Sequence, residues 1–191
     1  MGKVVAHLRE RLPDDTILTN GAGNFAIWPG RQFLYGPGHR LLGSQAGAMG
    51  AGIPAAVAAK VAEPERLVLC FTGDGDFQMT MQELGTAMQA GAQPIVLVHN
   101  NGTYGTIRMH QEREFPGRVS GTDVVNPDFT AIGKAYGMYA ARVETAEAFI
   151  AAFAEARAST TGALIEMIVD KEALTPGLSL SQIRAAALKG G

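Results

Sequence analysis

Residues 67–77 read Leu67-Val68-Leu69-Cys70-Phe71-Thr72-Gly73-Asp74-Gly75-Asp76-Phe77, an apolar run that passes into an acidic, glycine-rich turn. A short apolar run bounded by turn residues predicts a strand buried on both faces of a parallel sheet. Beyond the turn, apolar residues recur at helical spacing at Phe77, Met81, Leu84 and Met88, which predicts a helix over 77–90. The turn therefore lies where open α/β sheets bind ligands and where free helix N–H groups favour a phosphate.

The rest of the chain repeats this alternation of strand and helix. Apolar runs predict further strands over 16–19, 94–99, 138–143 and 163–169, and helical spacing predicts helices over 49–61, 127–136, 145–160 and 179–188. Such alternation predicts a doubly wound α/β fold, with a mainly parallel sheet and helices on both faces. Residues 1–191 are expected to form a single domain.

Local chemistry predicts some of the boundaries. Asn126 is expected to cap a helix that Pro127 opens, and Gly91 to end one in a left-handed conformation. The segment Gly21-Ala22-Gly23-Asn24-Phe25-Ala26 fits a dinucleotide fingerprint, but no Asp or Glu occurs between Asp15 and Glu63 to bind a ribose. Trp28-Pro29-Gly30 is also expected to cut short the helix that should follow. We interpret the segment as a turn whose Asn24 and Phe25 are candidates for the border of a substrate cavity.

Composition excludes several classes of function. Sixteen basic and eighteen acidic residues give a net charge of −2 without a basic block, so no nucleic-acid partner is expected. There is no apolar run of about 18 residues and no charged-then-apolar leader, so no membrane partner is expected and the location is expected to be cytoplasmic. Cys70 is the only cysteine, which excludes an internal disulfide and fits a buried position in a reducing compartment.

A second polar segment is expected at the same edge of the sheet. The strand over 94–99 leads into His99-Asn100-Asn101-Gly102-Thr103-Tyr104-Gly105. Because the carboxyl ends of parallel strands share one edge, the carboxylate of Asp74 and an asparagine amide oxygen are expected to face one crevice. Oxygen ligands beside a phosphate site suit Mg²⁺, which prefers octahedral coordination and keeps water. The chain has no P-loop lysine.

At this point the sequence resembles a known family. The stretch that begins Gly73-Asp74-Gly75 and closes Asn100-Asn101 is similar to the long signature of thiamine diphosphate (ThDP) enzymes. Between these ends, Phe77-Gln78-Met79-Thr80, Gln82-Glu83-Leu84, Thr86-Ala87 and Pro94-Ile95 resemble the acetolactate synthase (acetohydroxyacid synthase) large subunit group. The resemblance extends from about Thr16 to Val169 and is loosest over 31–45.

The resemblance implies a site for ThDP and Mg²⁺. The implied metal ligands are Asp74, the side chain of Asn101 and the backbone carbonyl of Thr103, with the N–H groups of Gly75 and Asp76 on the diphosphate. Asp76 replaces the small Ser or Ala common in the family, so its carboxylate is expected to turn away or reach water. The implied cofactor-binding residues are Gly47, Met49, Gly73, Gly75, Asp76, Phe77, Asn101, Thr103, Tyr104 and Gly105.

An upstream segment, Gly47-Ala48-Met49-Gly50-Ala51-Gly52-Ile53-Pro54-Ala55-Ala56, resembles the family segment that holds the aminopyrimidine ring. That resemblance implies that the Gly47 carbonyl accepts a hydrogen bond from the 4'-amino group and that the Met49 N–H donates to a ring nitrogen. It also implies that the Met49 side chain wedges the cofactor into its V shape, and a flexible, polarizable side chain suits that role.

The resemblance further implies the C-terminal part of a larger enzyme that decarboxylates a 2-oxo acid such as pyruvate and transfers the acyl carbanion to an acceptor. No catalytic residue is expected within this chain, because the family's activating glutamate comes from the pyrimidine-binding domain of a partner chain. A homodimer or tetramer is expected. A ThDP-dependent 2-oxo acid decarboxylase, a separate small subunit and a non-catalytic nucleotide- or phosphate-binding module are the alternatives.

Some polar side chains have a structural interpretation. His99 is expected to be hydrogen-bonded at the end of its buried strand. His110 lies in a segment that often covers the active site in this family, which makes it a candidate functional residue. Glu112, Arg113 and Glu114 are expected to form a solvated helix face.

Overall fold

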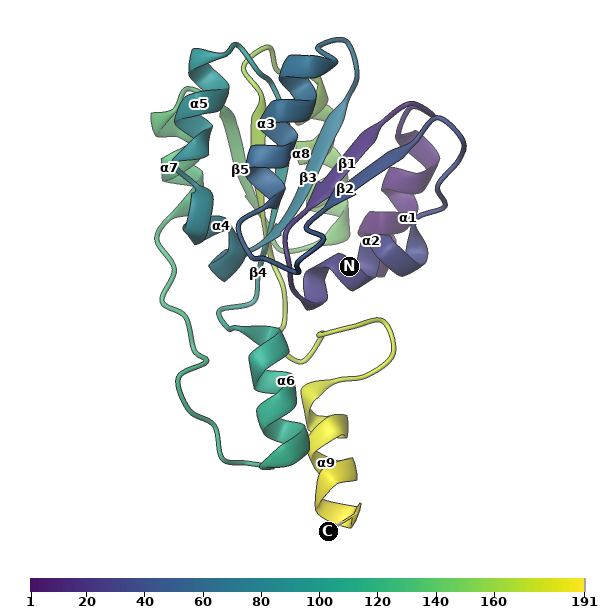
Figure 1. The fold of residues 1–191 in the computed structure, drawn as a ribbon, viewed down its shortest axis with the longest axis vertical. Coiled ribbons are helices and arrows are strands. Elements are labelled where there is room, and N and C mark those ends of the chain that lie inside the picture. Colours follow the sequence, from purple (N-terminus) through teal and green to yellow (C-terminus); the bar gives the residue numbers. More distant parts are fainter. Residues whose placement is uncertain (191) are drawn as a thin grey trace.

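The structure is a computed structural model that describes residues 1–190, and within this range it contains one sheet of six strands paired in parallel. The strands lie in the order β2-β1-β3-β4-β6-β5 (Figure 1). They are β1 (Ile17–Asn20), β2 (Arg40–Gly43), β3 (Val68–Gly73), β4 (Ile95–Asn100), β5 (Tyr139–Val143) and β6 (Ala163–Ile168). The helices are α1 (Gly2–Arg11), the 3-10 turn η1 (Asn24–Ala26), α2 (Ile27–Gln32), α3 (Gly52–Ala62), α4 (Asp74–Thr80), α5 (Glu83–Gln89), α6 (Gly105–Glu114), α7 (Phe129–Ala135), α8 (Ala146–Ala158) and α9 (Leu180–Gly190). The predicted doubly wound α/β class is confirmed.

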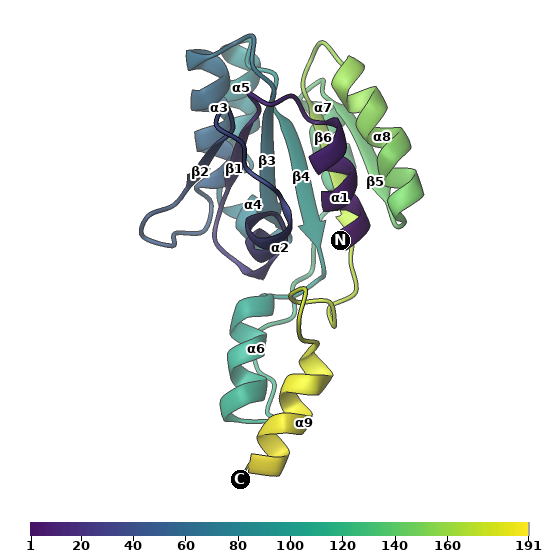
Figure 2. The ribbon, with the colours of Figure 1, turned by 90° about the vertical axis from the view of Figure 1, so that its right-hand side faces the viewer.

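The sheet carries a hydrophobic cluster on each face, because side chains alternate along its central strands. In β4, Leu97 packs with α1, α2 and α8, whereas its neighbour Val98 packs with α3, α5 and α7 on the other face. Figure 2 shows the sheet between these helices. Every residue of β3 is buried, which explains its continuous apolar run. Cys70 is buried there as predicted, and burial raises the pKa of its thiol to about 12.

The strand order places a switch point between β1 and β3. From β1 the chain moves to β2 at one edge of the sheet, and from β3 it moves to β4 on the other side. Such a reversal leaves a crevice at the carboxyl ends of the strands.

Helices α6 and α9 lie side by side beyond the carboxyl edge of the sheet (Figures 1 and 2). Helix α9 is the helix predicted over 179–188. In the described part of the chain, each helix is too short or too polar to cross a membrane.

The helix predicted over 77–90 is wrong in its bounds. It begins on the turn itself, at Asp74, and it is divided into α4 and α5. At the division, the N–H groups of Leu84 and Gly85 donate to carbonyls three residues earlier (3.1 and 2.9 Å), which is the tighter 3-10 pattern. The predicted apolar stripe survives this break, since Phe77 and Leu84 are both fully buried in the same cluster.

The predicted helix cap at Asn126 is wrong. Helix α7 begins at Phe129, because Asp128 is the residue whose carboxylate accepts a hydrogen bond from the Ala131 N–H (2.9 Å). The side chain of Asn126 is engaged elsewhere, at the turn after β3. Gly91 does have the predicted left-handed conformation, with a φ of 65°.

Three other segments differ from the sequence-based expectations. The helix predicted over 49–61 begins later, since Gly47 and Gly50 both have left-handed backbone (φ 65° and 81°). Trp28-Pro29-Gly30 does not end a helix, because Pro29 lies in the first turn of α2, where its missing N–H leaves no hydrogen bond unmade. Strand β2 is not predicted by the sequence, because all of it is exposed at the sheet edge and no alternation marks it.

Candidate functional site

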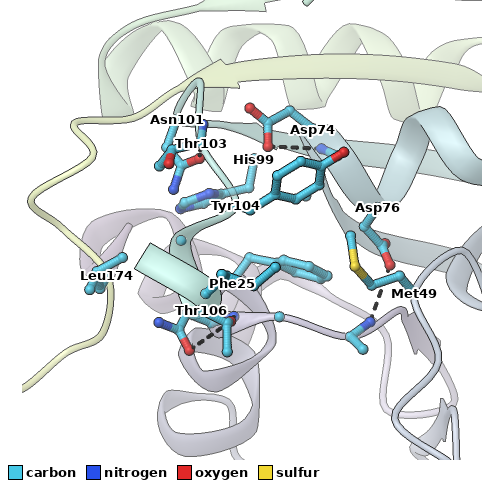
Figure 3. Close-up of a pocket in the computed structure, with 17 residues that line it drawn as sticks. Phe25, Met49, Asp74, Asp76, His99, Asn101, Thr103, Tyr104, Thr106 and Leu174 are labelled. Carbon is cyan, nitrogen blue, oxygen red and sulfur yellow. Dashed lines mark hydrogen bonds between the residues drawn. The ribbon is translucent and has the colours of Figure 1, made fainter. Parts of the chain in front are cut away.

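A cavity lies at the carboxyl edge of the sheet (Figure 3). The loops after β1, β3 and β4 form most of its wall, and Met49 and Leu174 complete it. Gly47 and Phe77 are not part of the wall: Gly47 is exposed outside it, and the Phe77 ring is buried in the core, 5.1 Å from the ring of Phe129. The other residues of the implied ThDP and Mg²⁺ site all line the cavity: Met49, Gly73, Asp74, Gly75, Asp76, Asn101, Thr103, Tyr104 and Gly105.

Asp74 is the first residue of α4, and only 3% of it is exposed. Its Oδ1 accepts a hydrogen bond from the Gly75 N–H (2.9 Å), and its Oδ2 accepts from the Gly102 N–H and from the Asn126 side chain (both 2.8 Å). Burial raises the pKa of the Asp74 carboxyl, against the lowering effect of these donors. All three donors are neutral, so none of them balances the charge of the carboxylate.

The two asparagines after β4 have different partners. Asn101 lines the cavity, and its Oδ1 accepts a hydrogen bond from the Thr103 N–H (3.1 Å). Asn100 does not line the cavity. It donates to the buried carboxylate of Glu166 on β6 (2.6 Å) and accepts from Asn126 (2.8 Å). The chain therefore presents one amide to the cavity and directs the other into the protein behind it.

The carboxylate of Asp76 joins three segments of the chain. It accepts hydrogen bonds from the Thr72 hydroxyl (2.6 Å) and from the N–H groups of Gly50 (2.8 Å) and Ala22 (3.2 Å). Burial raises the pKa of this carboxyl also. A Cβ on Gly21 would collide with the carboxylate, so the loop after β1 reaches it only because that residue is glycine. Of the two outcomes expected from the sequence, the side chain is therefore turned into the protein.

Two aromatic rings lie directly on the glycines of the turn after β3. A Cβ on Gly75 would collide with the ring of Tyr104, and a Cβ on Gly73 would lie 2.8 Å from the ring of Phe25. Both rings line the cavity, and Figure 3 shows them beside the turn. The glycines thus let apolar walls close onto the backbone at the start of α4.

His99 differs from its expected state. Its side chain lines the cavity and is 5% exposed, yet within residues 1–190 its Nε2 has no hydrogen-bond partner. The expected hydrogen bond at the strand end is therefore wrong for this atom. Burial, assisted by the positive N-terminus, lowers the pKa of His99 to about 4, which makes the ring neutral at pH 7.

The solvated face predicted for α6 is wrong at Glu112, although Arg113 and Glu114 are exposed. Glu112 is fully buried, and its carboxylate accepts hydrogen bonds from Arg108 (3.0 Å) and from Arg184 on α9 (2.7 and 2.5 Å). These arginines, with the Gly117 N–H, lower the pKa of Glu112 to about 2. The ion pair between Glu112 and Arg184 holds α9 against α6. His110 is exposed on α6 and does not line the cavity.

Sequence reasoning missed Asn126 and several residues of the cavity wall, among them Thr106 and Leu174. Thr106 exchanges two hydrogen bonds with Asn24 (both 3.1 Å), which ties the start of α6 to the loop after β1. Leu174 reaches the cavity from the segment before α9. Asn126 and Leu174 have no local signal, because they reach the site from segments far along the chain from the turn after β3. Thr106 directly follows the predicted residue Gly105, and its contact with the distant Asn24 is what the sequence does not show.

The donor set limits the metal that this cavity could hold. Among residues 1–190, no three His, Cys, Asp or Glu side chains gather as a metal site. A cation here would be bound by one carboxylate together with neutral amide and carbonyl oxygens. Such a set suits Mg²⁺, which also binds phosphates, and does not suit Zn²⁺.

Comparisons with known proteins identify relatives of the chain. The family model described as thiamine pyrophosphate enzyme, C-terminal TPP binding domain, matches residues 21–167. The mitochondrial acetolactate synthase catalytic subunit of Saccharomyces cerevisiae is 36% identical over 157 residues, 82% of this chain and 23% of that protein. The putative thiamine pyrophosphate-containing protein YdaP of Bacillus subtilis is 32% identical over 177 residues, 92% of this chain and 30% of that protein. The acetolactate synthase isozyme 2 large subunit of Escherichia coli is 34% identical over 138 residues, 71% of this chain and 25% of that protein. The chain thus spans less than a third of the length of these relatives.

Proposed function

The chain belongs to the thiamine pyrophosphate (ThDP) enzyme family, as its C-terminal cofactor-binding domain, and we propose that it forms the diphosphate and Mg²⁺ site of an acetolactate synthase-like enzyme. The family gives ThDP as the cofactor, which Mg²⁺ usually accompanies. One observation carries the proposal: the buried carboxylate of Asp74 has only neutral donors and shares a cavity with the amide of Asn101. A divalent cation would supply the positive charge that balances this carboxylate and that its neutral donors do not provide.

In this proposal the metal is held by Asp74, by the side chain of Asn101 and by the backbone carbonyl of Thr103. The N–H groups at the start of α4 would bind the diphosphate, because the first N–H groups of a helix have no backbone carbonyl partner within it. The Gly75 N–H, which donates to Asp74 Oδ1 (2.9 Å), would then be shared with the diphosphate. Phe77 takes part only through its backbone, since its side chain is in the core. The residues assigned to the diphosphate are Gly73, Gly75, Asp76, Phe77, Tyr104 and Gly105.

The aminopyrimidine end is assigned to the segment before α3, through the Gly47 carbonyl and the N–H and side chain of Met49. Two hydrogen bonds support this assignment, because they fasten the segment to the diphosphate turn. The Gly50 N–H donates to Asp76 (2.8 Å), and the Gly50 carbonyl accepts from the Thr80 hydroxyl (2.7 Å). Both ends of the cofactor would therefore be held by one connected scaffold.

When bound, ThDP supplies the electron sink for the decarboxylation of a 2-oxo acid. The residues of this chain orient the reacting groups and exclude water. The rings of Phe25 and Tyr104 and the side chain of Leu174 give the cavity apolar walls, which strengthen electrostatic interactions inside it. We propose a small 2-oxo acid such as pyruvate as the substrate, with transfer of its acyl group to an acceptor.

The proposed site is incomplete for catalysis, because no glutamate among residues 1–190 lines the cavity and could activate the cofactor. Glu112 is committed to two arginines, and Glu83 accepts a hydrogen bond from Thr86 on α5 (2.7 Å). We propose that the pyrimidine-binding domain of a partner chain supplies the glutamate, in a homodimer or tetramer. Exposed apolar side chains near the cavity fit such a partner: Ile107 is 52% exposed and Met79 49%.

Isothermal titration tests the cofactor assignment. The protein is titrated with ThDP in the presence and absence of Mg²⁺, and with ADP and NAD under the same conditions. We expect ThDP to bind only with Mg²⁺, and ADP and NAD to bind far more weakly. Equal affinity for ADP would reduce the chain to a general phosphate-binding module and overturn the proposal.

Turnover tests the claim that a partner completes the site. With ThDP, Mg²⁺ and pyruvate, the chain alone should not exceed the rate of the free cofactor. Adding the pyrimidine-binding domain should raise the rate by about 100- to 10,000-fold, the usual range for positioned proton transfer. Acetolactate as the product supports the synthase, and acetaldehyde would replace it with a simple decarboxylase. Turnover by the chain alone contradicts the shared site.

A further inference from the structure

Asn126 lies beside the carboxylate of Asp74, and every polar atom of its side chain amide has a partner. Its Nδ2 donates to Asp74 Oδ2 and to Asn100 Oδ1 (both 2.8 Å), and its Oδ1 accepts from Gln78 Nε2 (2.9 Å). The orientation of the amide follows from the carboxylate, which can only accept: the reverse orientation would place two oxygens against each other. Asn126 thus joins α4 to the end of β4.

The side chain of Asn126 is connected to the sheet through Asn100. Asn100 accepts a hydrogen bond from Asn126 and donates one to Glu166 Oε1 (2.6 Å). Glu166 is 2% exposed and lies on β6, where it pairs in register with Val98 of β4. The chain of contacts from Asp74 through Asn126 and Asn100 therefore ends on the rigid centre of the sheet.

We propose that Asn126 is a positioning residue for the metal, which holds the Asp74 carboxylate in one orientation before Mg²⁺ arrives. This inference rests on the proposed function, since it takes Asp74 as the metal ligand. Asn126 donates to only one carboxylate oxygen, Oδ2. Without it, that oxygen keeps only the Gly102 N–H, and the carboxylate gains freedom to rotate. Residues that hydrogen-bond a metal ligand commonly contribute roughly 10- to 100-fold to metal affinity.

The choice of metal ion separates positioning from general stability. Mg²⁺ demands near-ideal octahedral geometry, whereas Ca²⁺ accepts a variable number of ligands in flexible arrangements. A carboxylate that has lost its fixed orientation should therefore lose Mg²⁺ more than Ca²⁺. A protein that is merely less stable should lose both ions to the same extent.

Asp128 provides a matched control, two residues further along the same segment. Its carboxylate caps α7 and is exposed, and it makes no hydrogen bond to Asp74 or Asn100. Asp128→Ala should lower the melting temperature through loss of the cap. It should leave the metal requirement unchanged.

The experiment measures ThDP binding to the purified protein as a function of Mg²⁺ or Ca²⁺ concentration, with melting temperatures recorded in parallel. For Asn126→Ala we expect the Mg²⁺ concentration at half-saturation to rise by about 10- to 100-fold, with a smaller rise for Ca²⁺. Asn126→Ser introduces a hydroxyl that can donate one hydrogen bond but cannot bridge both acceptors, so it should shift in the same direction. This variant keeps the test valid if the alanine variant folds poorly.

The outcomes distinguish the inference from the proposed function. Equal shifts for both ions, or a shift in Asp128→Ala as large as in Asn126→Ala, would overturn the positioning role while leaving Asp74 as the metal ligand. ThDP binding by the unaltered protein that needs no metal would overturn the proposed function, and this inference with it.

Discussion

The turn after β3 and the junction of α6 with α9 each bury a carboxylate, and they treat it in opposite ways. At the turn, Asp74 is held by neutral N–H donors and burial raises its pKa. At the junction, Glu112 is held by two guanidinium groups and its pKa falls to about 2. A carboxylate paired with arginine is electrostatically complete, whereas one held only by amides still favours a cation. The first site is therefore suited to a ligand and the second to holding the fold.

The largest expected effect is the loss of metal binding in Asp74→Ala. Truncating one member of a buried charge pair commonly costs about 2 to 5 kcal/mol, so Mg²⁺-dependent ThDP affinity should fall by roughly 30-fold or more. Isothermal titration in saturating Mg²⁺ measures it, with circular dichroism to show that the fold is kept. Unchanged affinity would mean that the metal site is misplaced.

Glu112→Leu should act on the fold and not on the metal. The change leaves Arg108 and Arg184 without their carboxylate, and breaking a buried pair in this way costs roughly 3 kcal/mol. Hydrogen exchange should show the amides of α9 opening first. Protection of α9 equal to that in the unaltered protein would show that the arginines find other partners and that the junction does not depend on Glu112.

The same junction should respond to acid in a predictable direction. Because the pKa of Glu112 is lowered from its ordinary 4.5 to about 2, its contribution to stability is present above pH 4.5 and is lost as the pH falls toward 2. The stability difference between the unaltered protein and Glu112→Gln, followed by urea unfolding, should therefore shrink over that range. A difference that stays constant from pH 6 to pH 3 contradicts the assigned role of the charge.

The smallest expected effect concerns the two asparagines. Asn101→Ala removes a neutral oxygen, so it should weaken Mg²⁺-dependent ThDP binding by about 10-fold, less than Asp74→Ala does. Asn100→Ala acts only indirectly, through Asn126 and the Gly102 N–H, and should have a weaker effect still. Titration of both variants with Mg²⁺ settles their order. A larger effect at Asn100 would show that the register of the site is off by one residue.

Sequence patterns could predict the scaffold of the site but not its supports. The strand that ends at Gly73 and the turn around Asp74 are local features, because burial on both faces and glycine spacing leave a continuous signature. Asn126 and Arg184 act on partners 52 and 72 residues away, on elements that only the sheet order and the α6–α9 packing bring together. A window of sequence cannot contain such a pair, so Asn126 is read as a helix cap and Glu112 as a surface residue.

The sequence failed to predict the edge strand β2 and the division of the helix after the turn for a different reason. Strand β2 is exposed throughout, so neither of the patterns that mark strands is present. The division between α4 and α5 leaves the helical stripe of Phe77 and Leu84 intact, because the 3-10 turn changes the phase very little. Hydrophobic spacing therefore reports which face is buried more faithfully than where a helix ends.

The most direct measurement is a crystal structure of the protein with ThDP and Mn²⁺, in which anomalous scattering locates the metal that stands in for Mg²⁺. We predict an anomalous peak about 2.1 Å from oxygens of Asp74, Asn101 and Thr103, the distance expected for Mg²⁺. The diphosphate should lie against the first turn of α4. A peak bound elsewhere, or ThDP bound with no metal at Asp74, would contradict the account.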